Sequence, residues 1–270
     1  MYSSRLARAV ASSMLTAALL ASAAAVSADQ SKALDWSGDL AAGTHFGVNG
    51  INGRIVADGI AGSRASVHAV AVSRLGDVST VRLKVKQTPG SVVVCADTPD
   101  QHVSDDCSIS QSVGHVDSDH AIRVDFTVHV PHGTAFRART VNGAISIDGV
   151  NGSVDAVTVN GSITITGAAQ ARAKTVNGSI DASFRDMSWN GALNYATVNG
   201  AIAVRLPRAA TFSVHARTLN GAIRATDFGL SPERHRFVGG SLDGVVGSKD
   251  GGRSLSLRTV NGAITLSAAP

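Results

Sequence analysis

The sequence contains few aromatic residues, few prolines and only two cysteines, and each scarcity narrows the class of protein. Phe, Trp and Tyr together make up 4% of the 270 residues. Proteins that bind single-stranded nucleic acid stack the bases on aromatic side chains, so no nucleic acid is expected as a partner. The same scarcity argues against a stacking platform for sugars, for which only Trp36 and Trp189 remain.

Signature motifs of common enzymes are also missing. The chain contains no G-x-S-x-G, no H-E-x-x-H, no phosphate-binding loop with its Lys and no nicotinamide fingerprint. The glycines stand instead in short repeated units. We therefore expect a protein that is not an enzyme and needs no cofactor.

The first 28 residues have the layout of a secretory signal peptide. Arg5 and Arg8 precede the apolar stretch 9–25, and Val26-Ser27-Ala28 forms a small-x-small cleavage site. Cleavage after Ala28 would give a periplasmic or secreted chain, whereas an uncleaved leader would be a membrane anchor. No later stretch is apolar enough to span a bilayer, so no transmembrane segment is expected after cleavage.

Cys95 and Cys107 are the two cysteines. Exported chains with two cysteines close in sequence usually join them, and the spacing is not that of a C-x-x-C redox pair. A disulfide that closes this short loop would stabilise the fold by about 3 kcal/mol in the chain-entropy model.

Charge is divided unevenly along the chain. The chain has 24 basic and 20 acidic residues, and without Arg5 and Arg8 the two signs of charge nearly balance. Residues 29–136 carry an acidic excess, whereas residues 137–270 carry a basic one. A basic end of this kind can face an anionic surface, although ordinary solvated charge would look the same.

A unit of the form Thr-Val/Leu-Asn-Gly-Ala/Ser-Ile recurs in the second half. It begins at Thr140, Thr158, Thr175, Thr197, Thr218 and Thr259, so that most copies lie about 20 residues apart. This period is typical of a repeat architecture. The last step is close to two ordinary ones, and Leu242-Asp243-Gly244-Val245 within it could be a degenerate copy. The structural repeat residues are Asn142, Gly143, Asn160, Gly161, Asn177, Gly178, Asn199, Gly200, Asn220, Gly221, Asn261 and Gly262.

The flanks of each unit are rich in Val, Ile and Thr, which predicts strands. A hairpin at Asn-Gly would place Val141 and Ile145 on opposite faces of the sheet. If the chain instead continues without reversing, Val141, Ile145 and Ile147 point inward and Thr140 and Asn142 point outward. We therefore predict an all-β fold, a β-solenoid of stacked strands with Asn side chains in ladders. The alternative is a twisted antiparallel β meander.

Residues 29–136 are expected to form an N-terminal β region that caps or begins the same stack, which then continues through residues 137–270. Strands are predicted at 54–58, 65–73, 79–86, 91–96 and 121–130, the last with clean alternation of apolar residues. Such cover is needed because the open end of a strand stack is an exposed sheet edge.

The order of several segments resembles a known family. Trp36-Ser37-Gly38, "GVNGINGRIVADG" from Gly47, "VDFTVHVPHG" from Val124 and the serial "TVNG" units are similar to the bacterial putative-adhesin β-strand-repeat family, whose head domain is of unknown function. The resemblance implies an exported, non-enzymatic protein of the cell envelope and assigns no catalytic residue. Because no surface anchor is recognised, a soluble periplasmic or released protein is favoured.

The residue before each repeat Thr is often basic, which gives the candidate binding residues Arg139, Lys174, Arg217 and Arg258. With the degenerate copy counted, these would fall on every second coil, about 10 Å apart. Such a strip would suit an anionic lipid or polysaccharide of the envelope, although spacing that merely avoids like-charge repulsion is the simpler interpretation. The oligomeric state is not predicted.

Two other chemistries are possible. A polysaccharide-acting enzyme on a β-helix would gather carboxylates in one groove, and Asp148, Asp155, Asp181 and Asp186 are the candidates. The segment 97–120 holds His102, His115 and His120 among several aspartates, which could ligate a metal. Its spacing fits no metal-site template, so we predict no metal site.

Overall fold

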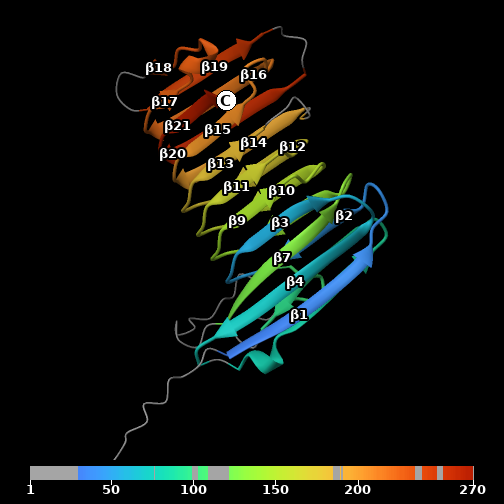
Figure 1. The fold of residues 1–270 in the computed structure, drawn as a ribbon. Helices are drawn as coiled ribbons and strands as arrows, with labels where there is room; N and C mark the ends of the chain where they lie inside the picture. The colour runs from blue at the N-terminus through green and yellow to red at the C-terminus, as the bar shows by residue number, and fades with distance from the viewer. Residues whose placement is uncertain are drawn as a thin grey trace, which may run out of the picture.

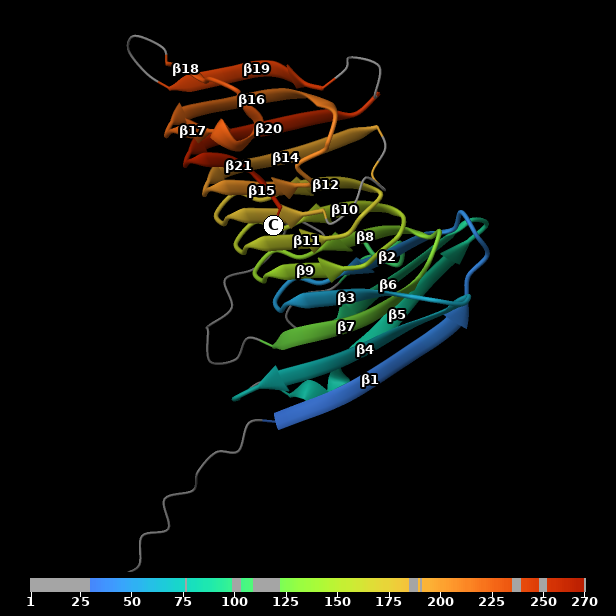
Figure 2. The same ribbon diagram turned by 45° about the horizontal axis from the view of Figure 1, so that its top comes forward.

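The computed structural model describes residues 30–75, 77–98, 103–108, 122–184, 189, 191–234, 239–247 and 252–269. The expected signal peptide lies outside this range. The described chain is all-β and forms two large sheets that face each other across one interior (Figure 1, Figure 2).

The first sheet, named sheet A, contains ten strands. In spatial order they are β1 (Gln30–Asp39), β4 (Arg64–Ser73), β7 (Arg123–Pro131), β3 (Ile55–Ile60), β9 (Ile145–Asp148), β11 (Ile163–Thr166), β13 (Ile180–Ser183), β15 (Ile202–Leu206), β21 (Ile264–Ala268) and β17 (Ile223–Arg224).

The second sheet, named sheet B, contains eleven strands. Their order across the sheet is β18 (Glu233–Arg234), β19 (Gly240–Val246), β16 (Phe212–Asn220), β20 (Ser254–Asn261), β14 (Ala192–Asn199), β12 (Gln170–Lys174), β10 (Ser153–Val157), β8 (Ala135–Arg139), β2 (His45–Asn49), β6 (Ser91–Asp97) and β5 (Arg82–Thr88). Two short 3₁₀ helices, η1 (Val78–Thr80) and η2 (Thr226–Phe228), complete the described elements.

Each repeat unit bridges the two sheets and lies directly on its neighbours. A strand of sheet B leads through Thr-Val-Asn-Gly into a strand of sheet A, and equivalent strands pair in parallel. Ile145, Ile163, Ile180, Ile202 and Ile264 therefore form one buried column. The prediction that the copies stack without reversing direction at Asn-Gly is confirmed.

Antiparallel pairs occur as well, at both ends of the described stack. β1 pairs with β4 and β4 with β7 at one end of sheet A, while β5 pairs with β6 at the same end of sheet B. At the other end β16 pairs with β19 and β19 with β18. The boundary at residue 136 stays a prediction. It falls within β8, which pairs with β2, and β3 pairs with β9 across it.

Most strands expected in residues 29–136 are present within a few residues. The exception is 79–86, where the first residues form η1 and only the remainder joins β5. β1 and β2 were not expected from the sequence. β1 places Leu34 and Trp36 against the core, although its pattern of small and polar residues gives little signal for a strand.

The spatial order of the rungs departs from their order in the chain. β20 lies between β14 and β16, so the last repeat unit is inserted between the two units that precede it. The degenerate copy suggested at Leu242 to Val245 is wrong: this segment belongs to β19, which runs antiparallel to β16. The long step before Thr259 is the length of chain that forms this end hairpin and returns.

The predicted orientation of the repeat residues is wrong at two positions. The repeat Thr is buried in every copy, from 2% exposed at Thr158 to 6% at Thr259, whereas Val159, Val176 and Val198 are 38–39% exposed. The chain bends at the corner between the sheets, so the alternation of one strand does not carry into the next. Ile145 still points inward, as expected, because it starts a new strand.

The inward Thr hydroxyl has a defined partner. Thr158 Oγ1 donates to Gly143 O at 3.0 Å, and Thr175 Oγ1 donates to Gly161 O at 2.9 Å. The same bond to the glycine carbonyl of the neighbouring rung is made by Thr140, Thr197, Thr218 and Thr259. A Val at this position could not satisfy that carbonyl, which explains why Thr rather than Val is the buried residue.

Candidate anion-binding face

The outward side of sheet B carries several basic residues of the repeat region. In a strand alternate side chains point to the same face, so each rung offers two or three outward positions. Exposed basic side chains occupy six of these positions, and we call this set the cationic face: Arg137 and Arg139 on β8, Arg172 and Lys174 on β12, Arg217 on β16, and Arg258 on β20.

The four basic residues predicted from the sequence do lie in one column. Pairing registers give the order Arg139, Val157, Lys174, Ala196, Arg258, Arg217. The expected alternation is therefore correct for the first two cations and wrong for the last two. Arg258 and Arg217 face each other on adjacent strands because the final repeat unit is inserted next to β16.

A second column of cations was missed in the sequence. Arg137, Asp155 and Arg172 lie in register two residues before the first column. The sequence did contain an indication of this column, because an arginine stands at the third position before the repeat Thr in two of the six copies. Because Arg137 and Arg172 stand on alternate rungs, they are about 10 Å apart along the stack.

Two carboxylates of the described residues lie at the cationic face: Asp155 among its arginines, and Asp243, which contacts His215 two residues before Arg217. Asp155 Oδ2 is 3.1 Å from Arg137 Nε and 3.9 Å from Arg139 Nη2. Arg172, Lys174, Arg217 and Arg258 form no ion pair with another residue of the described part of the chain. The face therefore keeps a net positive charge, and like charges on adjacent strands such as Arg217 and Arg258 destabilise the sheet unless an anion shields them.

The corner beside the cationic face has its own regular columns. Each Asn Nδ2 donates to the Asn Oδ1 of the preceding rung at 2.8–2.9 Å, in the order 52, 142, 160, 177, 199, 261, 220. The predicted Asn ladder is confirmed, with Asn52 as its first member although its Ile-Asn-Gly triplet is a loose copy. Next to it run the partly exposed Val159, Val176, Val198, Val260 and Leu219.

The aspartates proposed as catalytic lie on opposite sides of the molecule. Asp155 belongs to the outward side of sheet B, whereas Asp148 and Asp181 are on β9 and β13 of sheet A. Asp181 forms a two-pronged ion pair with Arg205, with N–O distances of 2.6 and 3.1 Å. Asp186 lies outside the described residues. The three described aspartates therefore share no groove.

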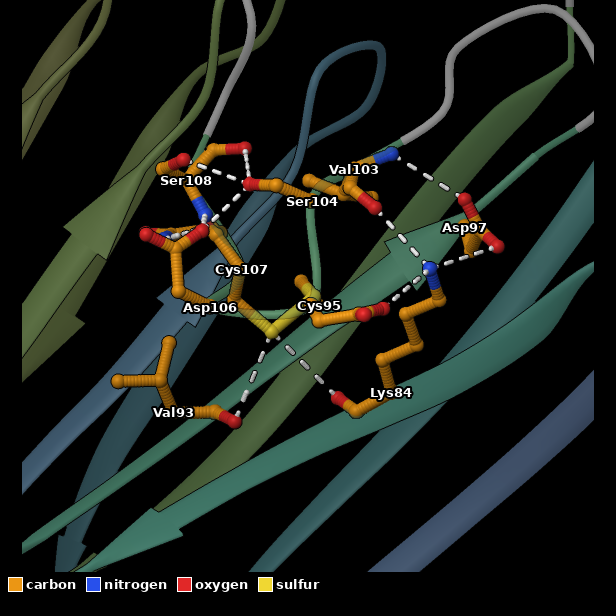
Figure 3. The surroundings of a disulfide bond; sticks show 11 residues. Lys84, Val93, Cys95, Asp97, Val103, Ser104, Asp106, Cys107 and Ser108 are labelled. Carbon is orange, nitrogen blue, oxygen red and sulfur yellow. Dashed lines mark hydrogen bonds and ion pairs between the residues drawn. A yellow bond between two sulfur atoms is a disulfide. The ribbon is translucent and has the colours of Figure 1, made fainter.

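The predicted disulfide is present. Cys95 on β6 is joined to Cys107, with a Cα–Cα distance of 5.7 Å, and the bond packs with Val103 and Val93 on the outward side of sheet B (Figure 3). Lys84 Nζ lies 3.2 Å from Asp97 Oδ2 and also donates to Val103 O. The hydrogen bond and charge of Asp97 raise the pKa of Lys84.

Asp106 forms hydrogen bonds within this loop (Figure 3). Its carboxylate accepts hydrogen bonds from Ser104 Oγ and from the backbone N–H of Ser108. These bonds, the Ser104 bond first, lower the pKa of Asp106 to about 2. His102, His115 and His120, the histidines of the possible metal loop, lie outside the described residues; within the described part no three His, Cys, Asp or Glu side chains are placed to hold a metal.

The fold and the face together define an all-β repeat protein with a cationic sheet surface. Within the described ranges no helix has the length and apolar character needed to cross a membrane. No family model and no curated protein matches the chain.

Three solved structures are similar to the chain, and all three are described as putative adhesins or cell adhesion proteins. One is from Clostridium sporogenes, with a TM-score of 0.49, 12% identity, and 88% of this chain and 100% of that chain covered. The second, from Bacteroides fragilis, has a TM-score of 0.32 and 11% identity over 88% of this chain and 97% of that one. The third, from Parabacteroides distasonis, has a TM-score of 0.25 and 9% identity, with the same coverage.

Proposed function

We propose that the chain is a non-catalytic, exported β-repeat protein of the bacterial cell envelope, built as a β-solenoid, that binds an anionic envelope component through its cationic face. The observation that carries the proposal is the column formed by Arg139, Lys174, Arg258 and Arg217. The role is that of an adhesin-like or scaffolding protein, and the leader at residues 1–28 would deliver it to the periplasm or the exterior.

Rigidity supports a binding role for this face. The cations stand on paired strands, and the corner next to them is fixed by the Asn ladder and the Thr hydroxyl bonds, so their spacing is set before a ligand arrives. Preorganised charges lose less conformational freedom on binding than charges on a mobile loop. A row of such cations engages a polymer or a lipid surface at several points at once, which raises the overall affinity well above that of one contact.

Arg217 and Arg258 add a second argument. Two like charges directly opposite each other on neighbouring strands are unfavourable in the free protein. A phosphate or carboxylate that bridges them removes this repulsion on binding. The free energy of the unbound pair therefore favours occupation by an anion.

The alternative, a polysaccharide-acting enzyme, finds less support in this arrangement. Hydrolysis of a glycosidic bond by the common mechanisms requires two carboxyl groups roughly 5–10 Å apart on either side of the bond. Asp155 and the pair Asp148 and Asp181 stand on different sheets. Of the two carboxylates at the cationic face, Asp155 is engaged by Arg137 and Asp243 by His215.

The test is a fourfold Ala variant at Arg139, Lys174, Arg217 and Arg258. We expect binding to vesicles that contain lipopolysaccharide or anionic phospholipid to fall at least about tenfold in low salt, and to fall less as salt screens the charges. The matched control replaces four exposed arginines on sheet A, Arg64, Arg123, Arg205 and Arg224, with Ala. This control loses the same charge from another face. Equal losses in both variants, or no loss in the first, would contradict the proposal.

A further inference from the structure

A groove of about 500 Å³ crosses the outward side of sheet B where six neighbouring strands begin. The first residues of β6, β2, β8, β10, β12 and β14 line it, namely Ser91, His45, Ala135, Ser153, Gln170 and Ala192. Six neighbouring strands span five strand spacings, or about 24 Å. The groove is therefore elongated and runs across the strands, along the direction in which the repeats stack.

The shape of the groove favours an extended polymer as its ligand over a flat surface such as a bilayer. Six of its fifteen lining residues are Gly, Ala or Ser, which leaves the hollow open between the longer side chains, and Gly47 and Val93 contribute to its floor. A bilayer surface cannot enter such a hollow, whereas a linear polymer can lie along it. The volume falls in the range of sites for small organic ligands, which suits a segment of two to three sugar units.

Charge selects an acidic chain over a neutral one. Arg137, Asp155 and Arg172 form the wall of the groove in that order. Asp155 is engaged by Arg137, while Arg172 has no ion pair within the described part of the chain. Arg172 therefore offers its planar guanidinium to a carboxylate or sulfate, and the two arginines match anionic groups about two rungs, or 10 Å, apart.

Polar groups beside the arginines complete the match. The hydroxyls of Ser91 and Ser153 can donate and accept hydrogen bonds, and Asp155 can accept from a sugar hydroxyl. The large aromatic residues near the groove, Phe46 and Phe136, point into the core and are at most 2% exposed. Recognition would therefore depend on hydrogen bonds and charge instead of stacking on a ring.

We propose that this groove, lined by Ser91, Ala135, Arg137, Ser153, Asp155 and Arg172, binds a segment of a linear acidic polysaccharide laid along the stack. The inference rests on the proposed function for the sign of the ligand's charge, and goes beyond it by naming the ligand class and the site. The column of Arg139, Lys174, Arg258 and Arg217 lies next to the groove and is not part of its lining.

The experiment measures binding of a galacturonate hexamer, with a neutral glucose hexamer of equal length and free glucuronate as comparison probes. Isothermal titration of the full chain should detect the acidic hexamer and neither comparison probe at the same concentration. Two variants separate charge from shape. Arg172→Gln removes the unpaired cation, and Ser153→Trp fills the groove without changing the charge. Both positions are exposed, so the fold should tolerate the changes.

We expect each variant to weaken binding of the acidic hexamer at least tenfold. The control for Ser153→Trp is Thr164→Trp, an exposed position on sheet A, and the control for Arg172→Gln is Arg224→Gln, an exposed arginine on β17 of the same sheet. Both controls should bind the hexamer within about threefold of the parent chain. Far-ultraviolet circular dichroism confirms that all four variants are folded.

The outcomes distinguish the two proposals. If the hexamer does not bind, or binds Ser153→Trp as tightly as the parent chain, the groove is not the site. The proposed function still holds in that case if the fourfold Ala variant binds vesicles more weakly than the parent chain. If the hexamer binds in the groove but the fourfold variant binds vesicles like the parent chain, the groove stands and the role of the column fails. Equal binding of the neutral hexamer overturns the assignment of an acidic ligand.

Discussion

Asn261 donates a 2.8 Å hydrogen bond to the side chain of Asn199, 62 residues earlier in the chain, and accepts one of 2.8 Å from Asn220. In space, the last repeat unit thus lies between two units that precede it in the sequence. β20 and β21 fill the gap between β14/β15 and β16/β17. The C-terminal segment is therefore an interior rung of the stack, and the same insertion brings Arg258 beside Arg217.

The Asn ladder should stabilise the stack in proportion to the bonds each member makes. Asn177 bonds to Asn160 and Asn199, whereas Asn220 bonds only to Asn261 within the described residues. We expect Asn177→Ala to lower the free energy of unfolding by about 2 kcal/mol and Asn220→Ala by about 1 kcal/mol. Urea denaturation measures both. Equal losses would mean that the ladder bonds contribute little beside the backbone pairing.

The buried Thr hydroxyl should matter more than the neighbouring exposed Val. Thr158→Val leaves the carbonyl of Gly143 without its hydroxyl donor, and we expect a loss of about 1–3 kcal/mol. Val159→Thr, on the outward side of the corner, should change stability by less than about 0.5 kcal/mol. Thermal and chemical denaturation check the pair. A larger loss of stability for Val159→Thr than for Thr158→Val would support the orientation first predicted from the sequence, with Val inward and Thr outward.

The corner glycine should tolerate no side chain. A Cβ on Gly161 would lie 2.1 Å from the carbonyl oxygen of Gly143 on the adjacent rung. Both groups are backbone, so the rungs would have to separate, and we expect Gly161→Ala to cost about 3 kcal/mol or more. Ser162→Ala, at the next and exposed position, is the control and should be nearly neutral. A stable Gly161→Ala protein with unchanged unfolding would show that the rungs are less closely packed.

The loop closed by the disulfide should open only in strong acid. The pKa of Asp106 is about 2 in the folded protein, below its ordinary value of 3.8, because the carboxylate accepts bonds from Ser104 and Ser108. Its stabilising contribution is therefore complete above about pH 4 and is lost as the pH falls through 2. Carbon-detected nuclear magnetic resonance of the carboxyl group gives the titration, and exchange of the Ser108 amide reports the loop.

Asp106→Asn provides the comparison for that titration. The Ser108 amide of this variant should show the same low protection, relative to the intrinsic exchange rate at each pH, at pH 5 and at pH 2, since the charged acceptor is gone at both. A titration midpoint near 4 in the parent protein would contradict the hydrogen-bonded arrangement of this loop.

Several features follow from the residues alone. The Thr-Val-Asn-Gly units predicted stacked strands and an Asn ladder, because a period of about 20 residues with Val, Ile and Thr leaves few other ways to bury one apolar face. The disulfide followed from two nearby cysteines in a chain that was expected to be exported. The basic residue before four of the six repeat Thr residues predicted a column of cations.

Other features depend on contacts between distant residues. The sequence predicted Val141 inward and Thr140 outward because strand alternation was extended through the corner. A bend of the backbone breaks that alternation, and the carbonyl of the neighbouring rung decides which side chain turns in. The candidate carboxylates stand at different places relative to the nearest Asn, and the two sheets place the described ones on opposite sides of the molecule.

The sequence by itself determined the unit of structure, which is a strand, a corner and a second strand. Each copy contains the local alternation of apolar residues and the Asn-Gly corner that this unit requires. Only the tertiary structure decided the order in which the copies stack, the insertion of the last copy and the groove at the strand starts. The physical reason is that identical rungs present nearly identical edges for pairing. The choice among them is made by the ends of the stack and by the length of chain that must return, and no single copy carries that information.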